Sequence, residues 1–504
     1  MSERSERSGQ LSELARDADW RRLDPRMLLV HPVNELVRFL PLIIGVFLLG
    51  RSGEGDRWHY LGVVIPIVLG LWRFATTSFR ITPGQIELRR GIVGRSVLTA
   101  PLDRVRSVEL TASPIHRALG LAKIEIGTGS GSRDRDNRLV LDSLGVAEGR
   151  RLRAALLHRA PPAPDAEVAA SSAATAADTV IMRFDPSWVR FAPLTTSGIV
   201  IALGILGGLS QFTGNIVERA ATSSTVGDQV RALPLGVAIP AGLGVFAVVA
   251  SVLASGGYLL TNWGFTLSRV AAGPAFHVRR GLLTTRETSI DVDRLRGLEV
   301  HEPLGLRLAG GGRLNAVVTG LSRRGGERTA LVPAAPRSVV LGVGEQVLQE
   351  SGPLDVDLVQ HGPEAFRRRI MRGVVPLAMV PLALGLLVLL DDAPVWPVLL
   401  TIPLPVLGVA LGLDRYARLG HALTPAYVVI RWGSLRGRRD ALQRTGIIGW
   451  NIRQSFFQRR AGLVSLTATT AAGQQSYEIL DVPEATAIAL ADEAVPGLLT
   501  PFLR

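Results

Sequence analysis

Apolar residues are concentrated in six long runs that form three pairs along the chain. The runs occupy residues 36–50 and 60–75, 191–213 and 233–261, and 374–390 and 395–413. A helix needs about 20 apolar residues to cross a bilayer core of about 30 Å. A single run of this kind also fits a buried helix of a soluble core, but three consecutive pairs favour membrane insertion. The pattern therefore predicts three transmembrane helical hairpins, at 36–75, 191–261 and 374–413.

The polar segments after the hairpins, residues 76–160, 262–350 and 420–503, have a different periodicity. Short stretches alternate apolar and polar positions, as in "LAKIEIGTG", where Ile124 and Ile126 are expected to face a core. Each segment ends on a helical spacing, in "GVAEGRRLRAALLHR", "SVVLGVGEQVLQ" and "PEATAIALADEAV". Each is therefore predicted to form antiparallel strands followed by one helix.

Composition marks the remaining boundaries. Residues 1–35 are polar, lack the apolar run of a signal peptide, and are expected to be a cytoplasmic N-terminal segment. Residues 161–180 lie in a stretch rich in Pro, Ala and Ser, which is typical of a flexible linker. A second linker is expected at 351–373.

Arginines are concentrated at the outer ends of the predicted hairpins, in "WRRLDPRM", "MRFDPSWVR", "FRRRIMR" and "DRYAR". The turns inside the hairpins are poorer in arginine, and the third contains Asp391 and Asp392 instead. Because arginine-rich segments stay in the cytoplasm, both termini and all three polar segments are predicted to be cytoplasmic.

The charge balance narrows the range of partners. The 504 residues carry a formal net charge of +13, nearly all of it from arginine, and Lys123 is the only lysine. Such a balance fits nucleic acid or an anionic membrane face. Aromatic residues make up only 5 %, which disfavours base stacking, so no nucleic-acid partner is expected. The absence of cysteine excludes disulfides and thiolate chemistry.

A charged signature occurs twice, as "PLDRVRSVEL" and "DVDRLRGLEV", 293 − 103 = 190 residues apart. The shared residues are Asp103, Arg104, Arg106 and Glu109 in the first copy and Asp293, Arg294, Arg296 and Glu299 in the second. The third copy, "LQRTGIIGW", is interpreted as having lost it, with Gln443 in place of Asp and Gly446 in place of the second Arg. Two catalytic centres are one reading. The preferred one is a structural corner, with Asp at a turn and the Arg and Glu side chains on the solvent face.

The repeat carries a family resemblance. A helical hairpin followed by "RRGIVGRSVLTAPLDRVRSVELTASPIHRALGLAKIEIGTG" resembles the bacterial PH-domain membrane proteins of the YdbS/YdbT type. "RRG" at 89–91 and 279–281 and "RWG" at 431–433 extend the likeness to three copies, the third being the weakest. The resemblance implies three PH-like modules, each a bent antiparallel β-sandwich or barrel closed by a C-terminal helix. The expected fold class is thus an α+β membrane protein, with each transmembrane hairpin followed by one such module.

Signatures of catalysis are absent from the sequence. It contains no HExxH, Walker A or GxSxG pattern. The glycine-rich Gly127–Asn137 lacks the Lys-Ser/Thr of a phosphate loop, and the series begun by Asp134 and Asp136 stops short of a calcium loop. No enzymatic activity, cofactor or metal site is expected.

Arginines near the predicted hairpin turns of the modules are the candidate binding residues. The set is Arg80, Arg89, Arg90, Arg95, Arg279, Arg280, Arg286, Arg431, Arg436, Arg438 and Arg439. The simpler interpretation of these arginines is that they control membrane topology and reflect codon bias. The functional reading is contact with anionic lipid headgroups, since the planar guanidinium can bond two phosphate oxygens.

The sequence therefore predicts a non-enzymatic, multi-pass protein of the bacterial plasma membrane. Its expected role is that of a membrane-held scaffold whose PH-like modules bind lipid headgroups, protein partners or a second copy of the chain, in envelope stress or maintenance. The alternative is a transporter or lipid-handling protein with the modules as regulatory domains. No charged residue lies in the middle of an apolar run, which disfavours ion-coupled transport.

Overall fold

The computed structural model describes much of the chain and divides it into two compact units. The described residues are 20–22, 24–26, 78–82, 85–90, 96–101, 107–127, 139–149, 152, 178–195, 234–270, 275–320, 329–391 and 393–498. The first unit comprises Met1–Val180, Gly264–Asp293 and Gly320–Ser322, and the second comprises Ile181–Trp263, Arg294–Thr319 and Arg323–Arg504.

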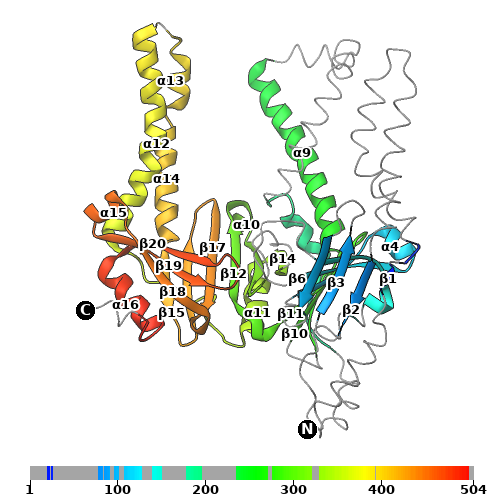
Figure 1. The fold of residues 1–504 in the computed structure, drawn as a ribbon. Helices are drawn as coiled ribbons and strands as arrows, with labels where there is room; N and C mark the ends of the chain where they lie inside the picture. The colour runs from blue at the N-terminus through cyan, green and yellow to red at the C-terminus, as the bar shows by residue number, and fades with distance from the viewer. Residues whose placement is uncertain are drawn as a thin grey trace. The chain divides into compact units, whose positions relative to one another are not determined.

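Three helical segments of the second unit are long and apolar enough to cross a membrane: Pro240–Asn262, Gly362–Asp391 and Trp396–Ala417. They belong to α9 (Leu235–Asn262), α12 (Gly362–Asp391), and the pair α13 (Trp396–Thr401) and α14 (Leu404–Ala417) (Figure 1). Helices are thereby confirmed for one of the two runs of the second predicted hairpin and for both runs of the third. The predicted hairpin at 36–75 lies outside the described residues.

Glycines hold α12 and α14 close together. A Cβ atom at Gly408 would lie 2.7 Å from the carbonyl oxygen of Gly373, and one at Gly412 would lie 2.9 Å from the Cα of Ile370. Small residues permit such close approach of membrane helices. Because α12 begins at Gly362, its first turns replace the last part of the linker expected at 351–373.

The first unit contains a four-stranded sheet, in the order β1-β2-β3-β4, and strands of a second sheet in the order β7-β6-β5-β11-β10-β9. The strands are β1 (Arg21–Arg22), β2 (Ser78–Ile81), β3 (Gln85–Arg90), β4 (Ser96–Pro101), β5 (Ser107–Ala112), β6 (Leu121–Gly127), β7 (Leu139–Gly145), β9 (Thr266–Arg269), β10 (Ala275–Arg280) and β11 (Thr285–Asp291). The short helix α4 (Pro114–Ala118) joins β5 to β6, and the helix predicted after β7 is present at residues 146–149. β8 (Thr179–Arg183) ends this sheet's order and carries the chain into the second unit.

Side chains from β2 and β3 share a core with those from β5, β6 and β7. Its members include Phe79, Ile86, Leu88, Val108, Ile124, Ile126, Leu141 and Leu152. The alternating pattern predicted for "LAKIEIGTG" is confirmed, because Ile124 and Ile126 are fully buried. β2 also pairs with β3, and the amide of Thr82 donates to the carbonyl of Gln85 at 2.9 Å.

The second unit contains a six-stranded sheet in the order β14-β13-β12-β17-β16-β15 and a three-stranded sheet in the order β18-β19-β20. Its strands are β12 (Leu295–Pro303), β13 (Gly311–Val318), β14 (Ala330–Pro336), β15 (Gly420–Leu423), β16 (Tyr427–Trp432), β17 (Arg436–Gln443), β18 (Ile447–Arg453), β19 (Leu463–Thr470) and β20 (Ser476–Pro483). Its other helices are η3 (Pro186–Phe191), α10 (Leu304–Leu308), α11 (Arg337–Leu348), η5 (Arg444–Gly446), α15 (Phe456–Arg460) and α16 (Glu484–Ala494).

The C-terminal segment has the predicted strands and terminal helix α16, but the short helix α15 between β18 and β19 was not predicted. Val428, Ile430 and Leu442 share a core with Leu466, Ile479 and residues of α16 such as Leu490 and Ala491. Gly281 and Gly433 have φ angles of 108° and 92°, so the "RRG" and "RWG" glycines supply the left-handed conformation that the hairpin turns require.

The repeat signature occupies strands that join one copy to the next. β5 pairs with β11, and β12 pairs with β17, so each larger sheet combines strands from two successive repeats. Glu109 lies opposite Thr288 in the first junction, and Glu299 lies opposite Asp440 in the second. The offsets, 299 − 109 = 190 and 440 − 288 = 152, equal those between the repeats themselves, 281 − 91 = 190 and 433 − 281 = 152. The two junctions therefore have the same register.

Two expectations about the signature are corrected. Glu109 and Glu299 are each only 7 % exposed and do not lie on a solvent face. The carboxylate of Glu299 is enclosed by side chains that bond it, Arg438 at 2.8 Å and Tyr477 at 2.8 Å. The offset of 152 aligns Asp293 with Thr445, and Gln443 with Asp291, so the alignment of Gln443 with Asp293 was wrong by two residues. Asp293 does lie in a turn, η4 (Val292–Arg294), whereas Asp103, Arg104 and Arg106 lie outside the described residues.

Candidate functional site

Among the described residues, five arginine side chains line a cavity of about 250 Å³ in the second unit. They are Arg307 on α10, Arg337 at the start of α11, Arg418 directly after α14, Arg431 on β16 and Arg439 on β17. Val300, Glu302, Gly310, Gly311, Leu341 and Leu354 complete the wall. Because Arg418 immediately follows a candidate membrane span, the cavity lies where the chain leaves that span.

Close backbone approach brings these elements together. β17 runs beside β12, and a Cβ atom at Gly437 would lie 2.7 Å from the carbonyl oxygen of Glu302. The amide of Leu304 donates to the carbonyl of Leu435 at 2.9 Å, which ties α10 to the turn between β16 and β17. The glycine-containing turn thus positions the strands that carry Arg431 and Arg439.

Carboxylates neutralise only part of this charge. Arg307 lies 3.0 Å from Asp414, and Arg337 lies 2.9 Å from Asp355. Glu302 accepts from Arg337 at 3.1 Å and lies 3.5 Å from Arg418. Five guanidinium groups against these three carboxylates leave a formal excess of two positive charges at the cavity.

Arg431 and Arg439 carry most of the unneutralised charge. The guanidinium of Arg439 donates to the carbonyl oxygens of Leu354 and Val356, and its side chain is buried. Burial, followed by the field of Arg431, lowers the pKa of Arg439 to about 10. Burial also lowers the pKa of Arg431 and of Arg418 below the ordinary arginine value, although Glu302 and Asp414 oppose the shift. A bound anion would offset this repulsion.

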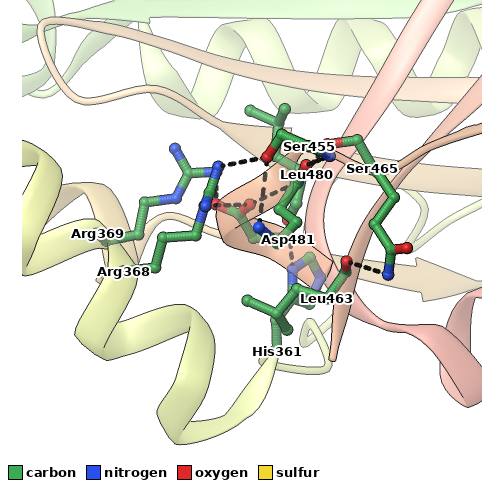
Figure 2. Close-up of polar contacts among 10 residues, drawn as sticks. His361, Arg368, Arg369, Ser455, Leu463, Ser465, Leu480 and Asp481 are labelled. Atoms are coloured by element: carbon green, nitrogen blue, oxygen red, sulfur yellow. Dashed lines mark hydrogen bonds and ion pairs between the residues drawn. The ribbon is translucent and has the colours of Figure 1, made fainter. Parts of the chain in front are cut away.

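A second polar cluster, the Asp481 cluster, joins α12 to the C-terminal sheet (Figure 2). Asp481 is 1 % exposed, and its carboxylate lies 2.9 Å from Arg368 Nε and 2.8 Å from Arg369 Nη2. The amide of Gln458 donates to the same carboxylate at 2.9 Å and to Ser465 at 3.0 Å. The first turns of a candidate membrane helix are therefore bonded directly to β20 and α15.

Two buried histidines extend this connection. His361 Nδ1 lies 2.8 Å from the carbonyl oxygen of Leu480, and His361 Nε2 lies 2.9 Å from His421 Nδ1. Because only an N–H can donate to the carbonyl, Nε2 of His361 is the acceptor and Nδ1 of His421 is the donor. Burial is the main cause that lowers the pKa of both rings, to about 4 for His361, so both are neutral at pH 7.

An aromatic surface lies beside the same end of α12. Phe456 and Phe457 on α15 are 64 % and 72 % exposed and contact each other edge to face. Ser455, which caps α15, lies 3.4 Å from Arg368 Nη2, and Figure 1 shows α15 next to the lower end of α12. Aromatic rings next to basic residues at the end of a membrane helix are typical of the interfacial region.

The predicted arginines are distributed among several environments. Arg80 is 2.6 Å from Glu87, and Arg80 and Arg89 lie over the ring of Trp20. Arg279 lies 3.9 Å from Glu287, Arg280 is buried on β10, Arg286 is on β11, and Arg436 is exposed at the start of β17. Arg438 is buried between Glu299 at 2.8 Å and Asp440 at 2.5 Å. Arg95 and the side chain of Arg90 lie outside the described residues.

Of the predicted set, the structure brings only Arg431 and Arg439 into the described cavity. Arg307, Arg337 and Arg418 were missed as binding residues. Arg418 lies in "DRYAR", which the sequence indicated for membrane topology, whereas Arg307 lies in a segment to which no binding role was assigned. No local signal indicated Arg337. Within the described part of the chain, no group of three or more His, Asp or Glu side chains is placed to hold a metal ion.

The apolar helices and the antiparallel sheets together define a membrane-associated protein with PH-like β-modules. The family comparison agrees, since residues 35–160 and 374–492 match the family model described as bacterial PH domain. Over these two stretches the chain is similar to the bacterial PH-domain family. No curated protein and no solved structure matches it.

Proposed function

We propose that this chain is a non-enzymatic, multi-pass protein of the bacterial plasma membrane that binds an anionic headgroup through the arginine cavity. The excess of positive charge at that cavity is the observation that carries the proposal. Positively charged groups are costly to bury unless they are paired. An anion that enters the cavity would supply the missing pairing.

Phosphate is the anion that fits this donor set best. Guanidinium groups bond phosphate through two parallel N–H groups, and each charge-assisted bond is stronger than a neutral one. Arg418 and Arg431 converge on the cavity from different elements, so they can contact different oxygens of one ligand. A membrane lipid is the favoured source, because the cavity lies where α14 ends.

The remaining contacts favour an anchored module over a transport path. The Asp481 cluster and the two histidines attach the C-terminal sheet to α12, and the exposed Phe456 and Phe457 are available to the interfacial region of the bilayer. α12 and α14 pack through glycines. A sheet that is fixed to a membrane helix in this way supports a scaffold with a cytoplasmic binding surface.

Binding of a short-chain anionic phospholipid to the detergent-purified full chain tests the proposal, with inorganic phosphate as a second probe and native mass spectrometry as the readout. Arg431→Gln should weaken lipid binding by about ten- to hundredfold, since one charge-assisted contact contributes about 1.5–3 kcal/mol. Arg436→Gln is the matched control, because Arg436 is exposed and does not line the cavity.

Binding of inorganic phosphate that equals lipid binding and is lost in Arg431→Gln would identify a soluble phosphate compound as the ligand. Equal lipid binding by the unmodified chain and by Arg431→Gln would overturn the headgroup assignment.

A further inference from the structure

Two strands at opposite ends of the repeat lie at the edges of their sheets. In the described part of the chain, β4 is the last strand in the order β1-β2-β3-β4, and β18 is the first in the order β18-β19-β20. Their equivalents in the other repeats are not at edges. β11 and β17 correspond to β4, and β5 and β12 correspond to β18.

The same pairing between successive repeats thus occurs twice in the chain. β4 and β18 are the two strands that would form a third pairing of this kind. The junctions β5–β11 and β12–β17 share one register, as the offsets of 190 and 152 show. Among the described residues, no strand of a neighbouring repeat is paired with β18 or with β4. An edge strand offers unpaired N–H and C=O groups to a strand of another molecule.

We infer that β18 of one copy pairs with β4 of a second copy, in the register of the two internal junctions. Residue 451 corresponds to Glu299, since 451 − 299 = 152, and residue 98 corresponds to Thr288, since 288 − 98 = 190. The shared register then places Asn451 opposite Leu98, Ile452 opposite Val97, and Arg453 opposite Ser96.

The exposed side chains on the two edges are complementary. Val97 is 50 % exposed and Ile452 is 43 % exposed, and the register places them directly opposite each other. Apolar β-branched pairs are favourable cross-strand neighbours. The internal junctions bury acidic residues that need partners, such as Glu299 beside Arg438, whereas Asn451 and Leu98 require no ion pair.

Features that usually protect an edge do not block this one. The β-bulge between Ile447 and Gly449 has its equivalent between Leu295 and Gly297 of β12, which pairs with β17 all the same. Pro101 corresponds to Gln443. The last residue of β17 that pairs with β12 is Leu442, so Gln443 lies one residue beyond the paired part. The proline therefore removes no hydrogen bond from the inferred ladder.

The occupant is a second copy because both complementary edges belong to the same chain. The contact is head to tail, so repetition gives rings or linear arrays. The inference does not depend on the arginine cavity, and loss of lipid binding in Arg431→Gln leaves it intact.

Disulfide trapping in membranes tests the inference, because the natural chain has no cysteine. A mixture of Val97→Cys and Ile452→Cys chains should form a crosslinked dimer under oxidation, since opposite Cβ atoms in a sheet are about 5 Å apart. Either variant alone should give at least about tenfold less dimer, given how strictly a disulfide requires proximity. Ile448→Cys is the matched register control, because Ile448 is exposed on the same strand, four residues from Ile452.

No dimer from the mixture, or an equal yield with Ile448→Cys, would overturn the inference. So would crosslinking found only within single chains of the double variant. A second measurement uses charge at the same exposed positions: Val97→Lys should convert oligomers to monomers in mild detergent, and Ile452→Glu in the same chain should restore them. Unchanged oligomers in Val97→Lys would also contradict strand pairing.

Discussion

Removing the charge of Asp481 should destabilise the C-terminal sheet more than the loss of any exposed ion pair would. Asp481 is 1 % exposed and has a φ angle of 54°, and it balances Arg368 and Arg369, whose side chains are 15 % and 12 % exposed. Asp481→Asn preserves size and tolerates the left-handed backbone, so it changes little besides the charge.

The expected cost follows from the burial of the two guanidinium groups. Removal of one partner from a buried ion pair costs about 3–5 kcal/mol, because the remaining charge stays buried without compensation. We expect about 4 kcal/mol for Asp481→Asn, which is about a thousandfold in the opening equilibrium. Asp481→Ala should cost about 1 kcal/mol more, since alanine is strained at this φ angle.

Thiol labelling of a buried cysteine measures this opening locally, which matters because the chain has more than one unit. Ala468 is 0 % exposed in the core of the C-terminal sheet, so Ala468→Cys reacts only when the module opens. Asp481→Asn should accelerate its labelling about a thousandfold.

Asp355→Asn in the same background is the control. Asp355 pairs with Arg337 at 2.9 Å, but its side chain is 61 % exposed, so the loss should be below about 1 kcal/mol. Acceleration of less than about tenfold by Asp481→Asn, or similar rates in the two variants, would refute the assignment of the Asp481 cluster as the main attachment of α12.

Three further predictions concern the same unit. His361 has its pKa lowered from 6.5 to about 4, mainly by burial, so the unfolded chain takes up this proton first and stability falls as the pH drops from about 6.5 towards 4. The loss should be about 2 kcal/mol at about pH 5, seen as a lower thermal midpoint, and His361→Gln should flatten the pH dependence between about pH 6.5 and 5. Gly433→Ala should lower the free energy of unfolding by at least about 1 kcal/mol, because its φ is 92° and a Cβ would collide with the carbonyl oxygen of Arg436. The same substitution should also weaken phospholipid binding. Binding equal to that of the unmodified chain would show that this turn does not position the arginines of the cavity. An environment-sensitive dye on Phe457→Cys should report apolar surroundings in vesicles, whereas the same dye on Ser476→Cys should report water; equal spectra would exclude contact of α15 with the bilayer.

Local periodicity was sufficient to predict the described long apolar helices and the core-facing strand positions, but not the short helices α4, α10 and α15 between strands. Ile124 and Ile126 alternate with polar residues, and both are buried on one face of β6, because successive side chains of a strand point to opposite faces. The apolar runs at 374–390 and 395–413 form α12, α13 and α14 for a similar reason, since their composition and length suit a membrane helix.

Local periodicity could not predict which residues are neighbours across a sheet. Glu299 alternates with apolar residues and was assigned to the solvent face, yet it is buried with Arg438, Tyr477 and His301 around it. Periodicity determines which face a side chain occupies but carries no information about which strand covers that face.

The sequence by itself indicated the three hydrophobic pairs and the alternation of core-facing strand positions, because each depends on residues that are close together in the chain. Tertiary structure alone decided that Arg307, Arg337, Arg418, Arg431 and Arg439 surround one cavity, and that strands of successive repeats share a sheet. Those arrangements depend on contacts between residues more than a hundred positions apart, whose partners are selected by packing and by the pairing of backbone N–H and C=O groups.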